Sequence, residues 1–169
     1  MALTGYVSGQ VVQSVPTRGV MKVDRFTADG TFTPPDGVFY AVAHIRAGGG
    51  GVGTASNGAG GTSSVAFAGG TISATGGAAS PNAGTAGTTT VRSNAGATNS
   101  GNGANLTAYR EQSPLEVFNV ISGQNGAYIV AGGAVTPGTG IAVTVGAGGT
   151  AGTSGAAGGS GYVWIEYLA

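Results

Sequence analysis

The sequence predicts an all-β fold, either an antiparallel β-sandwich or a jelly-roll-like domain, with long ordered glycine-rich loops. Short runs of β-branched and aromatic residues alternate with turn sequences, as they do in sandwiches and barrels. No window shows a helical period, because glycine or proline interrupts almost every stretch of helix length. Glycine accounts for 36 of the 169 residues, about three times its usual share of roughly 7%.

Two turn sequences divide the N-terminal part into strands. Residues 20–27 combine β-branched and apolar residues with charges, and the Asp29-Gly30 dipeptide favours a tight turn before residues 31–33. We therefore expect these two strands to pair as a β-hairpin. Residues 34–37 form the second turn sequence, with two prolines, an aspartate and a glycine.

Residues 38–47 form the longest predicted strand. One face carries Val38, Tyr40, Val42 and His44, and the other carries Phe39, Ala41, Ala43 and Ile45. Because both faces are mostly apolar, we expect this strand in the middle of a sheet. Further strands are predicted at residues 115–121, 127–131, 140–145 and 162–168.

The chain is organised as an N-terminal segment, residues 1–19, and one glycine-rich β domain, residues 20–169. Only seven of the 42 large apolar residues fall within residues 48–114, which consist mainly of Gly, Ala, Ser, Thr and Asn. We therefore expect residues 48–114 to be an excursion that cannot fold by itself, and the flanking parts to build the core.

Residues 146–161 contain glycine at every third position. Three residues per turn is the period of the polyproline II helix, and glycine at each third position gives such a helix one bare edge for close packing. Two alternatives remain: a polyglycine II-like extended helix packed on other glycine segments, or a long ordered loop whose period is accidental.

Ordering the glycine-rich excursion is costly. Fixing the backbone costs roughly 1–2 kcal/mol per residue, with glycine at the upper end, and this stretch has few large side chains to offset the cost. We therefore predict a homo-oligomer, in which copies of the segment pack on one another.

Composition excludes several classes of function. Six basic and six acidic residues give a formal net charge of zero, so no nucleic acid is expected as a partner. Without cysteine and with one histidine, the chain has no disulfide, no thiol nucleophile and no histidine cluster for a metal.

The sequence also gives no support for a cofactor or an enzyme. Residues 48–53 match G-x-G-x-x-G, but no helix is predicted after them and no acid occurs between Asp36 and Glu111 to bind a ribose. No nucleophile elbow is present. We expect His44 to be a half-buried, hydrogen-bonded strand residue and Trp164 to pack in the core.

Residues 26–38, followed by an apolar strand that runs into residues 48–51, resemble the glycine-rich domain of bacteriophage tail-fibre and tail-tip proteins. Residues 158–167 resemble the closing strand of that domain after its last glycine run. The resemblance covers about residues 23–53 and 158–168, and the middle of the chain only in composition. It implies a virion protein at the distal end of a tail, often trimeric, that contacts the host cell surface.

Residues 1–19 precede the part that carries the resemblance. With Tyr6, Val7, Val11 and Val12, they are a candidate attachment segment that docks on another tail or baseplate protein by strand addition. The alternative is an ordinary first strand of the sandwich. The segment lacks the features of a secretory signal, so we expect synthesis in the host cytoplasm and location in the virion tail.

Recognition is expected on the middle loops, since loops on a rigid scaffold often carry binding. The candidate contacts for a bacterial surface glycan or an outer-membrane protein are Asn94, Asn99, Asn102, Asn105 and Tyr109. Asparagine beside glycine also simply forms turns. The second functional hypothesis is a purely structural virion component, such as a baseplate accessory, fibre-joining or capsid decoration protein.

Overall fold

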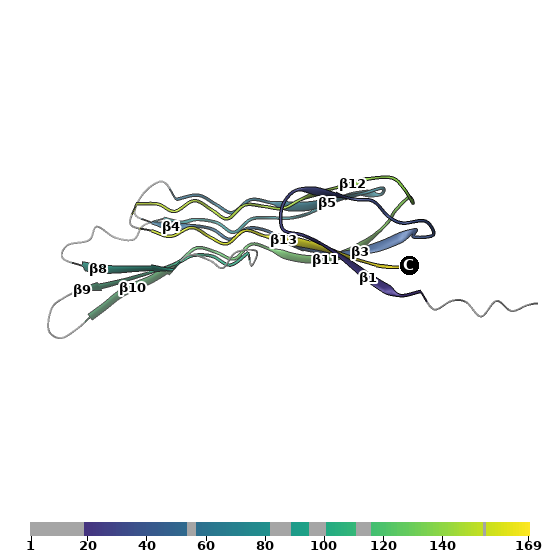
Figure 1. The fold of residues 1–169 in the computed structure, drawn as a ribbon. Helices are drawn as coiled ribbons and strands as arrows, with labels where there is room; N and C mark the ends of the chain where they lie inside the picture. Colours follow the sequence, from purple (N-terminus) through teal and green to yellow (C-terminus); the bar gives the residue numbers. More distant parts are fainter. Residues whose placement is uncertain (1–18, 54–56, 82–88, 95–100, 111–115, 154) are drawn as a thin grey trace, which may run out of the picture.

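The computed structural model describes residues 19–53, 57–81, 89–94, 101–110, 116–153 and 155–169, and this part of the chain is all β (Figure 1). The strands are β1 (Met21–Phe26), β2 (Gly30–Phe32), β3 (Tyr40–Arg46), β4 (Val52–Gly53), β5 (Ser63–Phe67), β6 (Gly70–Ala74), β7 (Ser80–Pro81), β8 (Thr89–Asn94), β9 (Asn105–Arg110), β10 (Glu116–Ser122), β11 (Tyr128–Ala134), β12 (Ile141–Thr144) and β13 (Tyr162–Leu168).

Two antiparallel four-stranded sheets face one another at one end of the molecule. Their strand orders are β1-β13-β3-β11 and β2-β12-β5-β6. Ile45 and Ile165 from the first sheet pack in one core with Val65 and Val143 from the second, and all four are buried. The predicted all-β sandwich is therefore confirmed.

The predicted central strand is correct, and the predicted hairpin is wrong. β3 lies between β13 and β11, with Ala41, Ala43 and Ile45 facing the core. In contrast, β1 pairs with β13 while β2 pairs with β12, so the two predicted hairpin strands belong to different sheets. The Asp29 carboxylate accepts a hydrogen bond from the Val145 amide (2.8 Å), which ties the β1–β2 connection to the end of β12.

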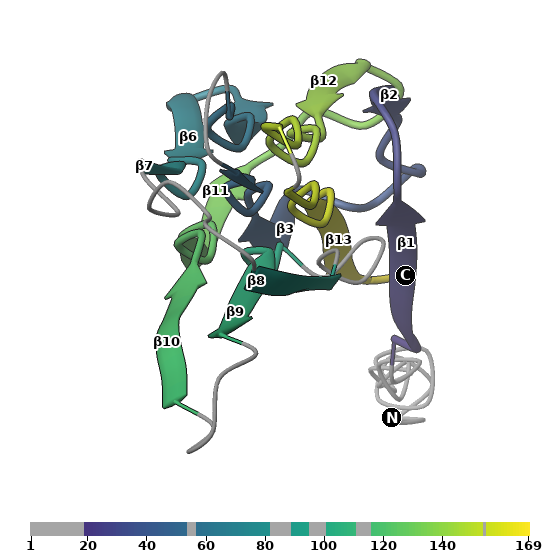
Figure 2. The same ribbon diagram turned by 90° about the vertical axis from the view of Figure 1, so that its left-hand side faces the viewer.

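Extended glycine-rich segments continue from the sandwich strands as a bundle. Seen end-on in Figure 2, they are small triangular coils, the shape that three residues per turn gives. We call these segments the glycine bundle; they are residues 47–53, 57–62, 75–79, 101–104, 123–127, 145–153 and 155–161.

Residues 47–53 form the centre of the glycine bundle, and their amides donate to three neighbours in rotation. The amides of Ala47 and Gly50 bond to segment 123–127, those of Gly48 and Gly51 to segment 57–62, and those of Gly49 and Val52 to segment 155–161, all at 2.8–3.0 Å. This repeat of three residues is what a threefold extended helix requires.

The carbonyls of the central segment accept from three other neighbours. Gly48 O accepts from Gly77, Gly49 O from Gly149 and Gly50 O from Ala104, at 2.8–3.0 Å. Six segments thus surround the central one.

The six outer segments also bond to each other in a closed ring. The ring bonds run from Gly60 N to Gly77 O, Gln124 N to Ala78 O, Gly123 N to Ala104 O, Gly101 N to Ser160 O, Gly158 N to Gly149 O and Gly58 N to Thr150 O, at 2.8–3.1 Å. The bundle therefore has one central and six peripheral members, which is hexagonal packing.

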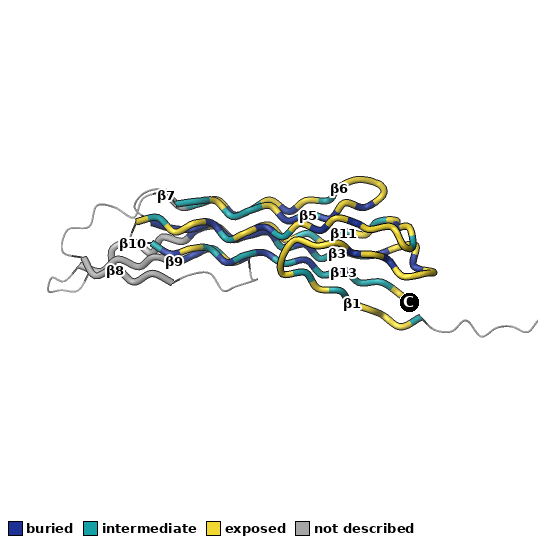
Figure 3. Tube along the Cα trace, turned by 45° about the horizontal axis from the view of Figure 1, so that its top comes forward, coloured by how far each residue is buried: buried dark blue, intermediate teal, exposed yellow. Residues whose placement is uncertain are grey.

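Close packing explains where glycine is required. A Cβ added at Gly49 would overlap the backbone carbonyl of Asn102, and one added at Gly50 would overlap that of Ala78. The centre has neighbours on every side, so the sequence has four consecutive glycines there. A peripheral segment has one open side, and Ala147 and Thr150 are exposed on it. Buried residues accordingly recur along the glycine-rich segments as well as in the sandwich (Figure 3).

The Gly-x-x run is divided into two antiparallel passes on either side of residue 154. The amides of Gly155, Gly158 and Gly161 donate to the carbonyls of Gly152, Gly149 and Gly146, at 3.0, 2.9 and 2.8 Å. Of the two alternatives, these bonds favour the packed extended helix.

The middle of the chain contributes more to the fold than its composition suggests. Val65 and Phe67 of β5 and Ala74 of β6 are buried in the sandwich core, so the expectation that only the flanking parts build the core is wrong. The glycine segments find their hydrogen-bond partners within the same chain. The homo-oligomer remains a prediction. Ordering of the glycine segments no longer supports it, because their partners lie within the same chain.

Ser63 joins the sandwich to the glycine bundle. Its side chain is fully buried, its hydroxyl donates to the Arg46 carbonyl (2.8 Å), and it accepts from the Gly146 amide (2.9 Å). These bonds satisfy two backbone groups at the point where β3 and β12 give way to bundle segments.

Tyr167 makes stability sensitive to alkaline pH. Burial, followed by the negative charge of Asp24 and its hydrogen bond to the phenol, raises the Tyr167 pKa above its ordinary value. Because the folded pKa is raised, the resulting stability is fully present below about pH 10 and is lost as pH rises through the folded pKa. We expect Tyr167→Phe to lessen the fall in melting temperature above about pH 10. Equal slopes for wild type and variant in thermal melts would contradict this.

Candidate functional site

The sheet β8–β9–β10 is held at the end of the glycine bundle opposite the sandwich (Figure 1). β9 is the middle strand and continues from bundle segment 101–104, and segment 123–127 follows β10. The sheet is therefore anchored by two hydrogen-bonded members of the bundle. We call it the distal sheet.

The distal sheet brings together three of the predicted contact residues. Asn94 at the end of β8 pairs with Asn105 at the start of β9, and Tyr109 pairs with Thr90 and Val117. Tyr109 is four positions beyond Asn105, about 13 Å further along the strand.

Asn102 is placed differently from these residues. It belongs to the glycine bundle and is exposed there, and its backbone carbonyl accepts a hydrogen bond from the Gly159 amide (2.9 Å). Asn99 and the predicted attachment residues Tyr6, Val7, Val11 and Val12 lie outside the described residues.

A second surface covers the outside of the sheet β1-β13-β3-β11. Side chains that alternate away from the core leave large apolar groups in solvent on this side. We call it the outer sheet face; its exposed apolar residues are Met21, Val23, Tyr40, Tyr128, Val130 and Leu168.

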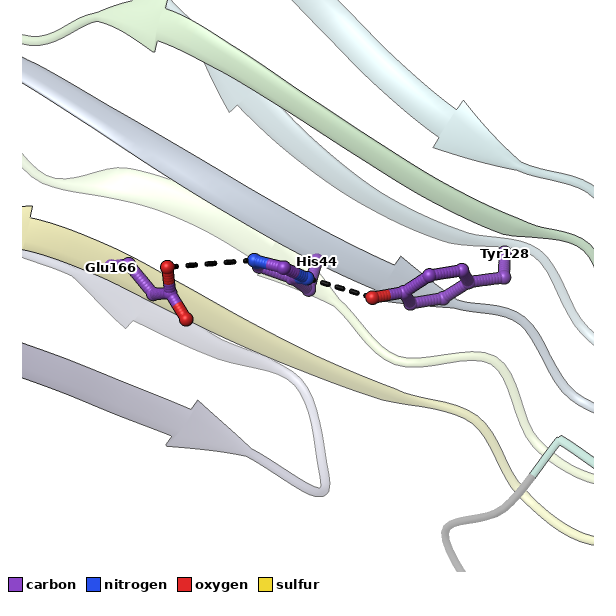
Figure 4. A network of polar contacts seen from close by, with 3 residues as sticks. All are labelled: His44, Tyr128 and Glu166. Atoms are coloured by element: carbon purple, nitrogen blue, oxygen red, sulfur yellow. Dashed lines mark hydrogen bonds and ion pairs between the residues drawn. The ribbon is translucent and has the colours of Figure 1, made fainter.

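A polar network crosses the outer sheet face at His44. Its Nδ1 forms a hydrogen bond with the Tyr128 hydroxyl (2.7 Å), and its Nε2 lies 3.6 Å from a carboxylate oxygen of Glu166 (Figure 4). The His44 side chain is 19% exposed, so the prediction of a half-buried, hydrogen-bonded histidine is confirmed. With both ring nitrogens engaged, the imidazole is oriented by its neighbours on β11 and β13.

The expected core position of Trp164 is wrong. Val163 and Ile165 point into the core, and Trp164 lies half-exposed on the outer sheet face between them. Its indole stacks on Tyr162 (centroids 5.0 Å apart, planes 8° apart) and contacts the His44 ring (4.9 Å). The alternation of Tyr162, Trp164 and Glu166 was the available sequence signal for this face.

Other site types are not formed by the described part of the chain. No group of three or more His, Asp or Glu side chains within it is arranged to hold a metal ion. No helix within the described ranges is long and apolar enough to span a bilayer.

A scan against protein-family models, a search of curated proteins and a search of solved structures each found no match to the chain. The distal sheet and the outer sheet face are the two candidate interaction surfaces of the described part of the chain.

Proposed function

We propose that this chain is a bacteriophage tail-tip or tail-fibre protein that contacts the host cell surface through its distal sheet. The proposal is supported by the resemblance of residues 23–53 and 158–168 to the glycine-rich domain of such proteins. It places the protein in the virion tail and gives it no enzymatic role.

One observation carries the proposal: the glycine bundle separates the distal sheet from Val20 and Ala169 at the sandwich end. Val20 and Ala169 bond to each other through their backbones (2.7 and 3.1 Å) at the sandwich end. At about 3.1 Å per residue, segment 123–127, which joins β10 of the distal sheet to β11 of the sandwich, spans roughly 16 Å. A protein attached near residue 19 would therefore present its distal sheet away from the attachment point.

The distal residues suit recognition of a polar surface. Asn94 and Asn105 provide amide donors and acceptors, and Tyr109 provides an aromatic ring with a hydroxyl group. These groups fit a bacterial surface glycan or an exposed segment of an outer-membrane protein. In this proposal residues 1–19 hold the protein on another tail or baseplate component.

The alternative proposal is a structural virion component without receptor contact. The outer sheet face favours it, because an apolar surface beside Val20 and Ala169 suits permanent assembly. The net charge of zero, from six basic and six acidic residues, also favours this alternative slightly.

The test is binding of the fluorescently labelled chain to a panel of bacterial strains, with native mass measured on the same sample. We expect saturable binding to some strains, and a roughly tenfold weaker affinity for Tyr109→Ala, since truncating an interface aromatic typically costs more than 1 kcal/mol. Thr144→Ala, at an exposed position of β12 in the sandwich, is the matched control and should bind as wild type does. Absence of binding to every strain by folded protein would favour the structural alternative.

A further inference from the structure

We propose that the outer sheet face is a contact surface for another copy of this chain. Eight large apolar residues are exposed among the described residues, and six of them lie on this one face. Side chains scattered singly over a surface need no explanation, but a concentration on one sheet face indicates an interaction site.

The dimensions of the face fit a reversible protein contact. Four strands about 4.8 Å apart and seven residues rising about 3.3 Å each give a planar footprint of roughly 400 Å². It is smaller than the roughly 800 Å² per partner of a standard interface, so we expect association to depend on concentration.

The aromatic groups of the face are arranged for a protein partner and not for a sugar. A sugar ring stacks on a free aromatic face, whereas Trp164 has Tyr162 stacked on it, the His44 ring 4.9 Å away, and the Arg25 guanidinium 6.0 Å from its ring centroid. The face also exposes aliphatic groups such as Val130, which is 50% exposed.

The charges favour a second copy as the occupant. Arg25, which is exposed on β1, supplies a positive group, and Glu166, whose side chain is 35% exposed, supplies a negative group on the same face. In a twofold arrangement the basic group of one copy meets the acidic group of the other. The formal net charge is zero, so copies do not repel one another. Two twisted sheets can pack face to face, and a second copy of the chain would supply the second sheet.

The experiment measures native mass against concentration for the full chain by sedimentation equilibrium. Trp164, the only tryptophan, lies in the face and reports its burial through quenching by acrylamide. We expect the mass to rise from one chain to two, with quenching falling over the same concentration range. In Val130→Glu, which places a charge on the apolar face, we expect association at least about tenfold weaker.

Phe39→Glu is the matched control, because Phe39 is 68% exposed and alternates with Tyr40 to the opposite side of the strand. This variant should associate as wild type does. If Val130→Glu does not fold, Val23→Lys on β1 makes the same test. A mass of one chain at all concentrations, or equal association of the face variants and wild type, would overturn the proposal. Protection of Trp164 by lipid vesicles or glycans without self-association would overturn it as well. The self-association experiment is independent of the cell-binding experiment, because it tests the outer sheet face and not the distal sheet.

Discussion

Replacing Gly49 by alanine is expected to destabilise the protein by about 3 kcal/mol or more, an effect at the upper end for a single methyl group. Gly49 is buried in the central segment of the glycine bundle, and an added Cβ would overlap the backbone carbonyl of Asn102. That carbonyl also accepts the Gly159 amide (2.9 Å), so it cannot move without breaking a ring contact. Chemical denaturation followed by circular dichroism would measure the loss.

Gly69→Ala is the control for the Gly49 substitution. Nothing lies within 4 Å of a Cβ added at Gly69, so we expect a change within about 1 kcal/mol, of either sign. Equal effects of the two substitutions would show that glycine in the bundle is not required by close packing.

Replacing Ile45 by alanine is expected to cost about 2–5 kcal/mol. Ile45 is fully buried in the middle of β3 and pairs with Val163 on β13 and Ile129 on β11, so the cavity would lie between the two sheets. Ile45→Val should cost about 0.5–1.5 kcal/mol. Urea denaturation of both variants measures the difference, and a loss below 1 kcal/mol for Ile45→Ala would contradict the core described above.

Strands with strong local patterns were predictable from the sequence. The apolar alternation of residues 38–47 gave β3 and its central position, and residues 162–168 gave β13 with the same bounds as in the structure. Each of these strands carries enough large apolar residues to define a core face by itself.

The hairpin prediction failed because a local turn sequence does not determine strand pairing. The chain bends at residues 27–29 and Gly30 begins β2, but the two strands pair in opposite sheets. The Asp29 carboxylate accepts a hydrogen bond from the Val145 amide, which is 116 positions away in the sequence. Contacts between residues so far apart in the sequence depend on core packing, which a short stretch of sequence does not reveal.

β5 and β6 were missed because their glycine-rich surroundings hid a hairpin signal. Val65 and Phe67 alternate with smaller residues, Gly70 follows with a φ of 135°, and Ile72 continues the pattern on β6. Composition averaged over residues 48–114 concealed this local alternation.

The hexagonal bundle was only partly predictable. The three-residue period of residues 146–161 indicated an extended helix, and the four central glycines indicated close approach. The partners were not predictable, because the six neighbours of segment 47–53 come from sequence positions 57 to 161. A glycine edge fits any neighbour of similar shape.

The candidate site residues were also only partly predictable from the sequence. The hydrogen-bonded role of His44 followed from its place in a strand, and its partners Tyr128 and Glu166 came only with the sheet order. Asn105 and Tyr109 were chosen for their chemistry, and the structure places them on a strand of the distal sheet.

The glycine bundle is an ordered scaffold whose hydrogen bonds form within one chain. Native-state hydrogen exchange of the amides of residues 47–52 tests this, in protein dilute enough to have the mass of one chain. We expect these amides to exchange at least about a thousandfold more slowly than in an unstructured peptide, because they open only with the core. Exchange at peptide-like rates in the single chain, with the sandwich amides still protected, would contradict the account.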